Sequence, residues 1–383
     1  MSAIGIGVIG LGWMGRVHSQ SYLRVGHHFP DLALAPRLVT AADPVAALRD
    51  DAARRYGFAR TTGGWAEVLA DPEVAAVSIT TPTDLHAEVG VAAARAGKHI
   101  WIEKPVGRDA AEAAAVAGAA AEAGVRSTVG FNYRNAPAVI RARELIATGH
   151  LGAVTHARFR FLGDYAAHPM GALSWRFTRA RSGLGVLGDL MSHAADLARH
   201  LVGPLAAVVA DQATFIPERP TPSGATSHYA VGGGALGPVE NEDWAACLVR
   251  FAGGARGSLE ASRVSVADQN NYGFEIHGTT GAVAWDFRRM GELRVSTGDG
   301  YQNLALAAEH IGPGVGEYAA FQPGAGIAMG YDDLKVIEAA TFLRSIVDGA
   351  PHGPTLDDAV HAANAVAAMA ESFRTGGWVP VAG

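Results

Sequence analysis

The sequence is short of the features that mark secreted, membrane-spanning and nucleic-acid-binding proteins. Cys247 is the one cysteine in 383 residues, so no intrachain disulfide framework can form. No run of about 18 apolar residues free of charge is present, which argues against a membrane span. With 31 lysines and arginines against 37 aspartates and glutamates, the chain offers no positive stripe to nucleic acid. The N-terminus lacks the basic start and long apolar segment of a signal peptide, so we expect a cytoplasmic protein.

The remaining composition is that of an ordinary globular protein with a sizeable core. Hydrophobic residues make up 49% of the chain and charged residues 18%. A length of 383 residues suggests two or three domains. Strand-like and helix-like segments alternate as far as Phe131, whereas from Val154 onward strand-like segments follow one another directly. We therefore predict one domain over residues 1–131 and a second over residues 132–383.

A glycine-rich turn follows the first apolar segment of the chain. Ile4–Ile9 has the pattern of a strand, Arg16–Val25 that of a helix, and Gly10-Leu11-Gly12-Trp13-Met14-Gly15 lies between them. This order of strand, G-x-G-x-x-G and helix is the context of a dinucleotide-binding loop. Gly10 permits the tight turn, Gly12 lets the backbone approach a pyrophosphate, and Gly15 lets the helix pack on the strand. We expect the loop to bind phosphates at the helix N-terminus.

The acidic residue at the end of the second apolar segment predicts the cofactor. Leu38–Ala42 has the pattern of a strand, and Asp43 ends it. A carboxylate there binds the hydroxyls of the adenosine ribose and repels a 2′-phosphate, so NAD is favoured over NADP. Arg49 and Arg54 on the next helix keep NADP as the less favoured alternative. Asp43 lies further from the glycines than usual, which we attribute to a loop insertion over residues 27–36. A helix N-cap role ahead of Pro44 is the ordinary interpretation of Asp43, and the two roles can coexist.

Three further strands of the N-terminal domain are followed by polar or charged residues. Thr81, Pro82 and His86 follow 74–80, Glu103-Lys104-Pro105 follows 99–102, and Asn132 follows 125–131. Strands that alternate with helices predict an α/β fold, a Rossmann-type doubly wound parallel sheet with ligands beyond the carboxyl ends of its strands. Lys104 would then stand at the mouth of a site. An exposed Glu-Lys pair in a turn is the alternative for Glu103 and Lys104.

The C-terminal domain is predicted to be α+β, with a large, open and mostly antiparallel sheet. Several segments with strand periodicity follow Val154, and glycine-bearing turns join some of them. An apolar helix over Gly183–Leu201 interrupts them. Two long glycine-rich stretches, Ile216–Glu242 and Tyr301–Met329, are typical of active-site lids or oligomer contacts. Closing helices lie within residues 332–374, where we expect them to pack back on the N-terminal domain.

The apolar helix carries the sequence Gly188-Asp189-Leu190-Met191-Ser192-His193. Asp189 and His193 are four residues apart and share one helix face, which Asp196 and His200 extend. Three interpretations compete. The polar residues form a solvent-facing stripe, they supply two ligands of a metal ion, or they perform acid/base chemistry, for which histidine has a well-placed pKa. No third cluster of ligands is evident, so we expect no metal site.

Together these motifs resemble, in order and spacing, the glucose–fructose oxidoreductase and inositol dehydrogenase (Gfo/Idh/MocA) family. The resemblance covers nearly the whole chain, with Thr-Pro-Thr at 81–83 where the family has Thr-Pro-Asn. It implies a catalytic triad of Lys104, Asp189 and His193. The expected cofactor-binding residues are Gly10, Gly12, Trp13, Met14, Gly15, Asp43, Thr81, Pro82, His86, Glu103, Lys104 and Asn132.

The resemblance also implies the reaction: NAD-dependent oxidation of a ring hydroxyl of a sugar, an anhydrosugar or an inositol. Segments 173–177, 215–220 and 274–278 look most similar to levoglucosan-type sugar dehydrogenases. The expected substrate-binding residues are Lys104, Tyr133, Trp175, Arg176, Asp189 and His193, since aromatic faces pack on sugar rings and arginine offers several donors. For Tyr133, Trp175 and Arg176, core or interface packing is the alternative.

The assembly and two rival functions complete these expectations. The family implies a homodimer or homotetramer built through the C-terminal sheet. A glycoside-processing enzyme that oxidises its substrate transiently is one rival, and a non-catalytic sensor of NAD or sugar is another. The identity of the sugar and of the carbon oxidised stays open.

Overall fold

Each half of the fold is built from two segments that lie far apart in the sequence. A computed structural model describes residues 2–222, 229–298 and 300–383. Unit 1 contains the residues up to Asn135 together with Met329–Val360, and unit 2 contains Ala136–Ala328 together with His361–Gly383. The predicted division after residue 131 therefore differs from the structure in two respects. Residues 132–135 belong to unit 1, and so do residues 329–360, which the prediction assigned to the C-terminal domain while expecting helices within 332–374 to pack on the N-terminal one.

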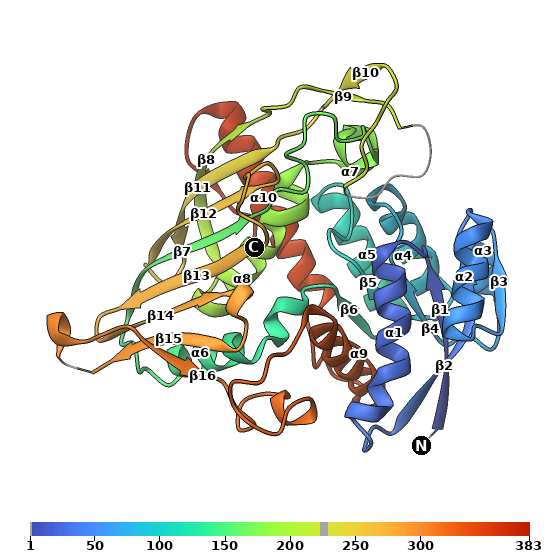
Figure 1. The fold of residues 1–383 in the computed structure, drawn as a ribbon, viewed down its shortest axis with the longest axis horizontal. Coiled ribbons are helices and arrows are strands. Elements are labelled where there is room, and N and C mark those ends of the chain that lie inside the picture. Colours follow the sequence, from blue (N-terminus) through green and yellow to red (C-terminus); the bar gives the residue numbers. More distant parts are fainter. Residues whose placement is uncertain (1, 223–228, 299) are drawn as a thin grey trace. The chain divides into compact units, whose positions relative to one another are not determined.

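Unit 1 contains a six-stranded parallel sheet with the order β3-β2-β1-β4-β5-β6 (Figure 1). Its strands are β1 (Ser2–Ile9), β2 (Leu34–Ala42), β3 (Arg60–Thr62), β4 (Ala76–Ile79), β5 (His99–Ile102) and β6 (Ser127–Val129). The central strands are buried apolar runs, as in β5, because helices cover both faces of such a sheet. The predicted Rossmann arrangement is confirmed. The strand order reverses between β1 and β4, and ligands of open α/β sheets bind at such a point.

The helices of unit 1 connect these strands, and one further helix comes from the C-terminal part of the chain. They are α1 (Trp13–His28), α2 (Ala46–Tyr56), α3 (Trp65–Ala70), α4 (His86–Arg95), α5 (Ala110–Ala123) and α9 (Tyr331–Asp348). Local sequence sets the ends of α5: the Asp109 side chain accepts a hydrogen bond from the backbone N–H of Glu112, and Gly124 is left-handed. Helix α9 packs beside α1 through its buried apolar residues, which explains its place in unit 1.

The spacing between the glycine loop and Asp43 has a different cause from the predicted loop insertion. Helix α1 runs on to His28, and β2 begins at Leu34. Residues 34–36 pair in register with residues 2–4 of β1, so they belong to the sheet. The extra residues thus lengthen a helix and a strand, because backbone pairing with a neighbouring strand continues past the apolar run that marks β2 in the sequence.

Unit 2 contains a nine-stranded sheet with the order β16-β15-β14-β13-β7-β12-β11-β8-β17. All neighbours are antiparallel except β12 and β7, which are parallel, so the predicted mostly antiparallel sheet is confirmed. The strands are β7 (Val154–Leu162), β8 (Leu205–Ala213), β11 (Trp244–Phe251), β12 (Arg256–Ser262), β13 (Asn271–Gly278), β14 (Gly281–Asp286), β15 (Glu292–Thr297), β16 (Ala307–His310) and β17 (Val379–Pro380).

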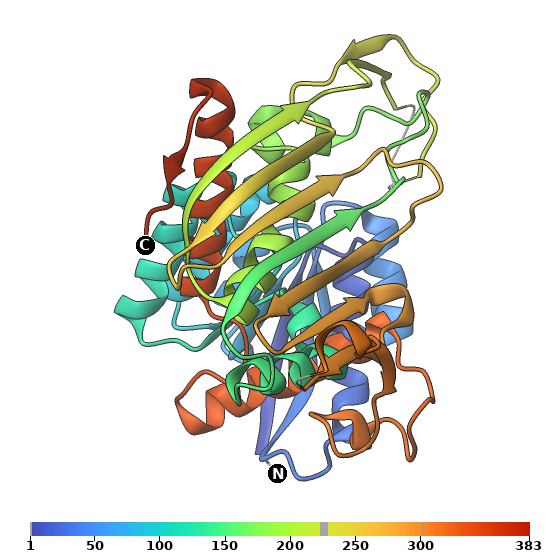
Figure 2. The same ribbon diagram turned by 90° about the vertical axis from the view of Figure 1, so that its left-hand side faces the viewer.

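One face of this sheet is covered and the other is open (Figure 2). The covering helices include α6 (Pro137–Ala147), α8 (Ser192–Val202) and α10 (Leu356–Thr375), whose Ser372 hydroxyl accepts from the backbone N–H of Ala210 in β8. A short helix α7 (Arg179–Ser182) precedes α8. Side chains alternate accordingly: Cys247 and Val249 of β11 are buried, whereas Leu248 between them is 56% exposed. Helix α10 belongs to unit 2 from His361 onward, so the predicted closing helices divide between the units.

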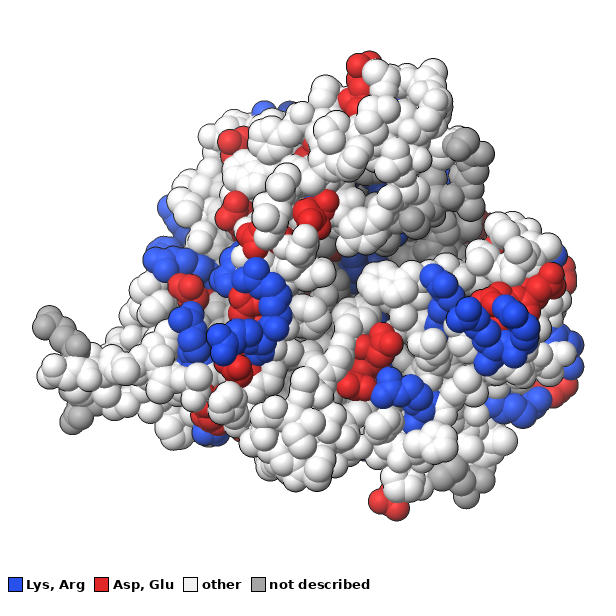
Figure 3. Space-filling model, in the orientation of Figure 1, with Lys and Arg blue, Asp and Glu red and all other residues white. Residues whose placement is uncertain are grey.

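Charges on this sheet are paired across strands. Arg158 of β7 lies 3.1 Å from Glu275 of β13, and Arg160 of β7 lies 3.7 Å from Asp286 at the end of β14. Figure 3 shows basic and acidic side chains mixed over these strands. Among the described residues, no helix is both long enough and apolar enough to cross a membrane.

The two long glycine-rich stretches contain short elements of regular structure. The first includes the hairpin of β9 (Glu218–Pro220) and β10 (Leu236–Pro238), and residues 223–228 within it lie outside the described residues. The second includes β16 and short 3₁₀ turns. The predicted helix over Gly183–Leu201 begins later than expected, as a π-helical turn over Leu187–Met191 that continues into α8.

Candidate active site

The glycine loop leaves open space only at its second glycine. Gly10 has a φ of +90°, and a Cβ there would lie 2.7 Å from the carbonyl oxygen of Thr80. A Cβ at Gly15 would overlap the carbonyl oxygen of Gly10. A Cβ at Gly12, by contrast, would meet nothing within 4 Å among the described atoms. Chain packing thus requires the outer two glycines, and Gly12 leaves the N-terminus of α1 open to a pyrophosphate.

Asp43 ties the end of β2 to this loop. One carboxylate oxygen accepts a hydrogen bond from the backbone N–H of Leu11 at 2.8 Å, and the other accepts from the N–H of Val45 at 2.9 Å. The N-cap of α2 is Val45, so Asp43 does not occupy the alternative capping position. The carboxylate is held at the carboxyl edge of the sheet beside the glycine loop, where an adenosine ribose would be bound.

His86 joins the loops that follow β4 and β5. Its ring nitrogens lie 2.8 Å from the carbonyl oxygen of Thr81 and 2.7 Å from that of Pro105. The ring is buried, and burial lowers the pKa of His86 although both carbonyl contacts oppose that shift. His86 therefore connects the Thr81-Pro82 segment to the Glu103-Lys104-Pro105 segment.

Two buried polar side chains at this edge have no hydrogen-bond partner among the described residues. They are the Oγ1 of Thr81, after β4, and both amide atoms of Asn132, after β6. Asn132 is fully buried. Unpaired buried polar groups are rare in native proteins and call for an explanation such as a missing ligand. A nicotinamide half of a dinucleotide, which carries amide and ribose hydroxyl groups, fits this pair of positions.

Glu103 and Lys104 differ in their surroundings although they are adjacent. Glu103 is buried, and its carboxylate accepts from Lys335 Nζ at 2.5 Å and lies 3.0 Å from His18 Nε2. Lys104 is half-buried. Strands β5 and β6 are paired, with Ile102 opposite Val129, so Lys104 and Asn132 both lie just past the same edge of the sheet. The alternative of an exposed Glu-Lys pair is excluded for Glu103 by its burial.

Asp189 lies on the π-helical turn of unit 2 and accepts a hydrogen bond from a tyrosine. The hydroxyl of Tyr165 donates to Asp189 Oδ2 at 2.6 Å. The turn is anchored by Glu242, whose carboxylate accepts from the backbone N–H of Leu187 at 3.0 Å. Burial and the charge of Asp189 raise the pKa of Tyr165 well above its ordinary value, so its phenol remains a donor. π-helical turns occur often at functional sites.

His193 follows on α8 and is 6% exposed. Its backbone carbonyl accepts a hydrogen bond from the Tyr272 hydroxyl at 2.8 Å, and its ring lies 5.7 Å from that of Phe161. Asp196 is also buried. The interpretation of a solvent-facing stripe is therefore wrong for His193 and Asp196. Within the described parts of the chain, no group of three or more His, Cys, Asp or Glu side chains is arranged to hold a metal ion.

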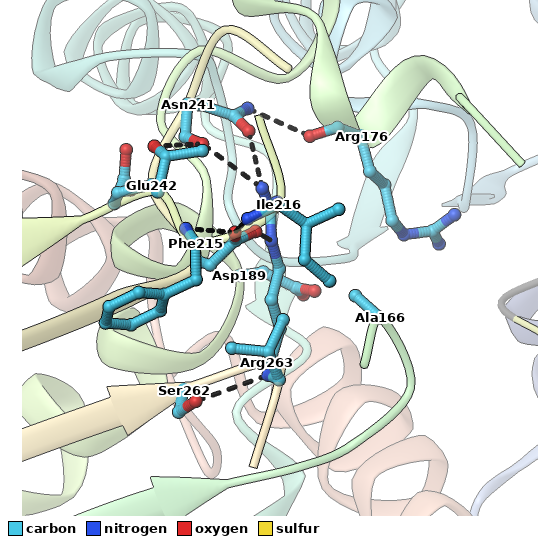
Figure 4. A network of polar contacts seen from close by, with 12 residues as sticks. Ala166, Arg176, Asp189, Phe215, Ile216, Asn241, Glu242, Ser262 and Arg263 are labelled. Atoms are coloured by element: carbon cyan, nitrogen blue, oxygen red, sulfur yellow. Dashed lines mark hydrogen bonds and ion pairs between the residues drawn. The ribbon is translucent and has the colours of Figure 1, made fainter. Parts of the chain in front are cut away.

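A buried ion pair organises the loop around the predicted substrate residues. Arg263 Nε donates to Asp243 at 2.8 Å, and Arg263 Nη2 donates to the side-chain oxygen of Asn241 at 2.9 Å (Figure 4). Asn241 in turn donates to the carbonyl oxygen of Arg176. The Arg176 guanidinium lies 4.4 Å from the centre of the Trp175 ring, so these two predicted residues contact each other. Tyr133 belongs to unit 1 and packs edge-on against Tyr331 at 6.2 Å.

Comparison with known proteins identifies the family. Residues 4–131 match a model described as an oxidoreductase family with an NAD-binding Rossmann fold, and residues 139–284 match a GFO/IDH/MocA C-terminal domain. The chain is 38% identical to levoglucosan dehydrogenase of Pseudarthrobacter phenanthrenivorans, over 100% of this chain and 99% of that protein. The chain belongs to the Gfo/Idh/MocA oxidoreductase family. The predicted family is thereby confirmed.

A second relative by sequence and a solved structure are also similar to this chain. Inositol 2-dehydrogenase of Rhizobium meliloti is 30% identical, over 78% of this chain and 81% of that protein. A solved structure of levoglucosan dehydrogenase in complex with NADH and levoglucosan has a TM-score of 0.94 and 36% identity, with 100% of both chains covered. The two enzymes named here are a dehydrogenase of an anhydrosugar, similar over the full length, and a dehydrogenase of an inositol, similar over about four fifths of each chain.

Sequence reasoning missed several residues that contact the predicted site residues. Tyr165 contacts Asp189, His18 and Lys335 contact Glu103, and Glu338 contacts Lys335. Lys335 had a recognisable signal, since the chain has three lysines and this one lies within an apolar helix. Glu338 lies in the same helix and shares that signal. Tyr165 and His18 had none, because a tyrosine or histidine in an apolar segment is most often an ordinary core residue.

Proposed function

We propose that this protein is an NAD-dependent dehydrogenase that oxidises a ring CH–OH group of an anhydrosugar, a sugar or an inositol to a ketone. The observation that carries the proposal is the open edge of the Rossmann sheet, where Lys104 follows β5 beside the unpaired, buried amide of Asn132. This edge offers a cation next to groups that suit a nicotinamide. The full-length similarity to levoglucosan dehydrogenase supports the anhydrosugar as substrate.

The cofactor would be held by unit 1. Gly12 and the N-terminus of α1 bind the pyrophosphate, Asp43 binds the adenosine ribose, and Thr81 and Asn132 bind the nicotinamide half. NAD supplies the acceptor for the hydride that leaves the substrate carbon. Relatives solved with NADH support this choice.

Three side chains act on the substrate in this proposal. His193 takes the proton of the hydroxyl group, because a neutral imidazole is a suitable base near neutral pH. Lys104 donates a hydrogen bond to the same oxygen as negative charge develops on it. Asp189 accepts a hydrogen bond from a neighbouring hydroxyl and favours the imidazolium form of His193. Trp175, Arg176 and Tyr133 contact the ring of the sugar.

A substrate panel tests the reaction. The purified protein is assayed for NADH release from levoglucosan, myo-inositol, scyllo-inositol and glucose, with NAD or NADP as cofactor. We expect levoglucosan with NAD to give the highest kcat/KM. Transient oxidation would leave the cofactor unreduced at the end of the reaction, so products without accumulated NADH would instead indicate a glycoside-processing enzyme.

Two alanine variants test the residues. We expect Lys104→Ala and His193→Ala each to lower kcat by about 10²- to 10⁴-fold, the usual contribution of an acid/base group. Lys98→Ala is the matched control, because Lys98 precedes β5 and donates only to backbone carbonyls of Asp71 and Val74 in the contacts described. Near-normal turnover of Lys104→Ala or His193→Ala would remove that residue from the mechanism.

We also propose that the open face of the unit 2 sheet binds a second copy of the chain, giving a homodimer or a homotetramer. The alternation in β11 supports this, since Leu248 is 56% exposed on one face of a strand whose opposite face, formed by Ala245, Cys247, Val249 and Phe251, is buried. Exposed apolar side chains on a long sheet face are typical of subunit contacts.

A further inference from the structure

One face of helix α9 contacts two motif segments of unit 1. Tyr331, Lys335 and Glu338 are spaced four and three residues apart, so they lie on the same face. The Tyr331 ring stacks on Trp13 of the glycine loop, with centres 5.5 Å apart and planes at 24°. Lys335 reaches Glu103, the residue before Lys104. Helix α9 therefore connects the cofactor loop with the segment that carries the proposed catalytic lysine.

Lys335 is a fully buried cation held between two carboxylates. Its ammonium lies 2.5 Å from Glu103 Oε1 and 2.8 Å from Glu338 Oε2, and all three side chains are at most 7% exposed. Removing charges from water is costly, and such a group persists only where good partners compensate it. We call His18, Trp101, Glu103, Lys335 and Glu338 the Glu103 network.

The rings of His18 and Trp101 form the aromatic part of the Glu103 network. His18 of α1 stacks on Trp101 of β5 with ring centres 3.6 Å apart, and His18 Nε2 lies 3.0 Å from Glu103. The Lys335 ammonium lies 5.8 Å from the centre of the Trp101 ring. The Glu103 carboxylate is thus contacted by a residue of α1 and by a residue of α9.

Near neutral pH, the protonation states of Glu103 and His18 favour these contacts with the Glu103 carboxylate. Burial would raise the pKa of Glu103, but the Lys335 charge and the His18 hydrogen bond outweigh it, so the pKa is lowered and Glu103 is a carboxylate. Burial lowers the pKa of His18 to about 4, so its ring is neutral. Burial raises the pKa of Glu338 to about 7, against the pull of Lys335. The phenol of Tyr22, which also faces Glu338, has a raised pKa through burial.

The backbone around Glu103 leaves its carboxylate little freedom. A Cβ at Gly130, which follows β6, would lie 2.5 Å from Glu103 Oε2. The carboxylate therefore packs directly against the backbone of the neighbouring strand end. Glu103 N donates to the carbonyl oxygen of Ile79, and Gly130 N donates to that of Ile102. Both the main chain and the side chain of Glu103 are held, and Lys104 is the next residue.

We propose that Lys335 is a positioning residue for Lys104: by fixing the Glu103 carboxylate it sets the turn from which the Lys104 ammonium reaches the substrate oxygen. The inference rests on the proposed function. A displacement of about 1 Å at a reacting group can cost about 10²-fold in rate, so a contact outside the reacting centre can have this effect. Lys335 needs no contact with substrate or cofactor in this role.

A double-mutant cycle with Lys104 tests the proposal. We expect Lys335→Met to lower kcat by about 10- to 100-fold, with the Kd for NADH changed less than about 3-fold. In the Lys104→Ala background, Lys335→Met should lower the residual kcat by less than about 2-fold, because there is no ammonium left to position. NADH fluorescence measures the Kd, and the thermal midpoint reports folding.

Controls separate positioning from loss of structure. Lys98→Met makes the same substitution at the amino end of β5 and should leave kcat unchanged. Lys335→Met alone leaves the Glu103 carboxylate buried without its cation. If this variant does not fold for that reason, the double variant Glu103→Gln/Lys335→Met, which removes both charges of the Glu103–Lys335 pair, takes the place of Lys335→Met in the cycle. Equal losses of kcat in both backgrounds, or no loss with Lys335→Met, would overturn the inference. Near-normal turnover of Lys104→Ala would instead reject the proposed function, and the inference with it.

Discussion

The orientation of the Asp189 carboxylate depends on Tyr165, a residue that belongs to none of the sequence motifs. The Tyr165 hydroxyl donates to it at 2.6 Å from a loop that directly follows β7. A hydrogen bond to a charged acceptor contributes about 1.5–3 kcal/mol, about twice as much as one between neutral groups. The raised pKa of Tyr165, which burial and the Asp189 charge produce, keeps the phenol protonated so that it orients the carboxylate at neutral pH.

Removing this hydroxyl should weaken catalysis and leave cofactor binding intact. We expect Tyr165→Phe to lower kcat/KM for the sugar by about 10-fold, with an unchanged Kd for NADH, because the lost donor faces Asp189 in unit 2. Tyr318→Phe is the matched control, since the Tyr318 hydroxyl donates only to backbone carbonyls of a remote loop in the contacts described. Steady-state kinetics measures kcat/KM for both variants. Equal losses of kcat/KM in Tyr165→Phe and Tyr318→Phe would contradict the prediction.

Among elements, α1, β5 and α9 share one buried polar network. The apolar sequence of β5 buries Trp101, and the Trp101 ring is contacted by His18 from α1 and by Lys335 from α9. Two helices and a strand are therefore joined by charges and rings rather than by aliphatic packing alone. Such a network restricts the register of α9 on α1, because a shift of one residue would leave Lys335 buried without Glu103.

The pH dependence of stability should report the Glu103 network. The pKa of His18 is lowered from 6.5 to about 4 in the folded protein, so the unfolded chain binds the proton first and stability is lost as pH falls from about 6.5 to about 4. Glu338 acts in the opposite sense, because its pKa is raised to about 7: its contribution is present below about 4.5 and is lost as pH rises through about 7.

We therefore expect His18→Gln to flatten the acid side of the stability profile. The side chain of glutamine can still donate to Glu103 but does not titrate. With a pKa of about 4 in the folded protein against 6.5 for a free imidazole, His18 should change the free energy of unfolding by about 3 kcal/mol across this pH range. Thermal midpoints measured between pH 4 and pH 7 should fall more steeply for the wild type than for the variant. Parallel profiles would show that His18 is not the group that titrates.

At the scale of the whole molecule, the chain builds its Rossmann unit, then unit 2, returns to the first unit with α9, and enters unit 2 again at His361. The unit 2 sheet has one face covered by helices and one face open, with paired charges and an exposed Leu248. Exposed apolar surface on the face of a sheet is one mark of a protein–protein contact. The proposed homo-oligomer would use this face.

A charge at the open face should weaken self-association. We expect Leu248→Glu to lower the molar mass in solution toward that of one chain, because a buried unpaired carboxylate would oppose the contact. Size-exclusion chromatography with light scattering measures the mass. Val266→Glu is the control: Val266 is 78% exposed but lies outside the strands. An unchanged mass for Leu248→Glu would place the contact elsewhere.

Local patterns alone predicted much of this protein. The strand, glycine loop and helix at 4–25 predict the dinucleotide loop, because steric demands on each glycine follow from a short stretch of chain. Buried runs ending in Asp43, Thr81, Lys104 and Asn132 predict one edge of a parallel sheet, since such strands end on the same side. The order of these motifs also identified the family before the comparisons confirmed it.

Tertiary structure alone decided which distant residues meet. Lys335 reaches Glu103 across 232 positions, Tyr165 reaches Asp189 across 24, and β12 lies parallel to β7 in a sheet of antiparallel neighbours. Periodicity reports only whether a side chain is buried, because it reflects the local geometry of a helix or strand. Which partner a buried charge or hydroxyl finds depends on how whole elements pack, and that choice is made by the complete fold.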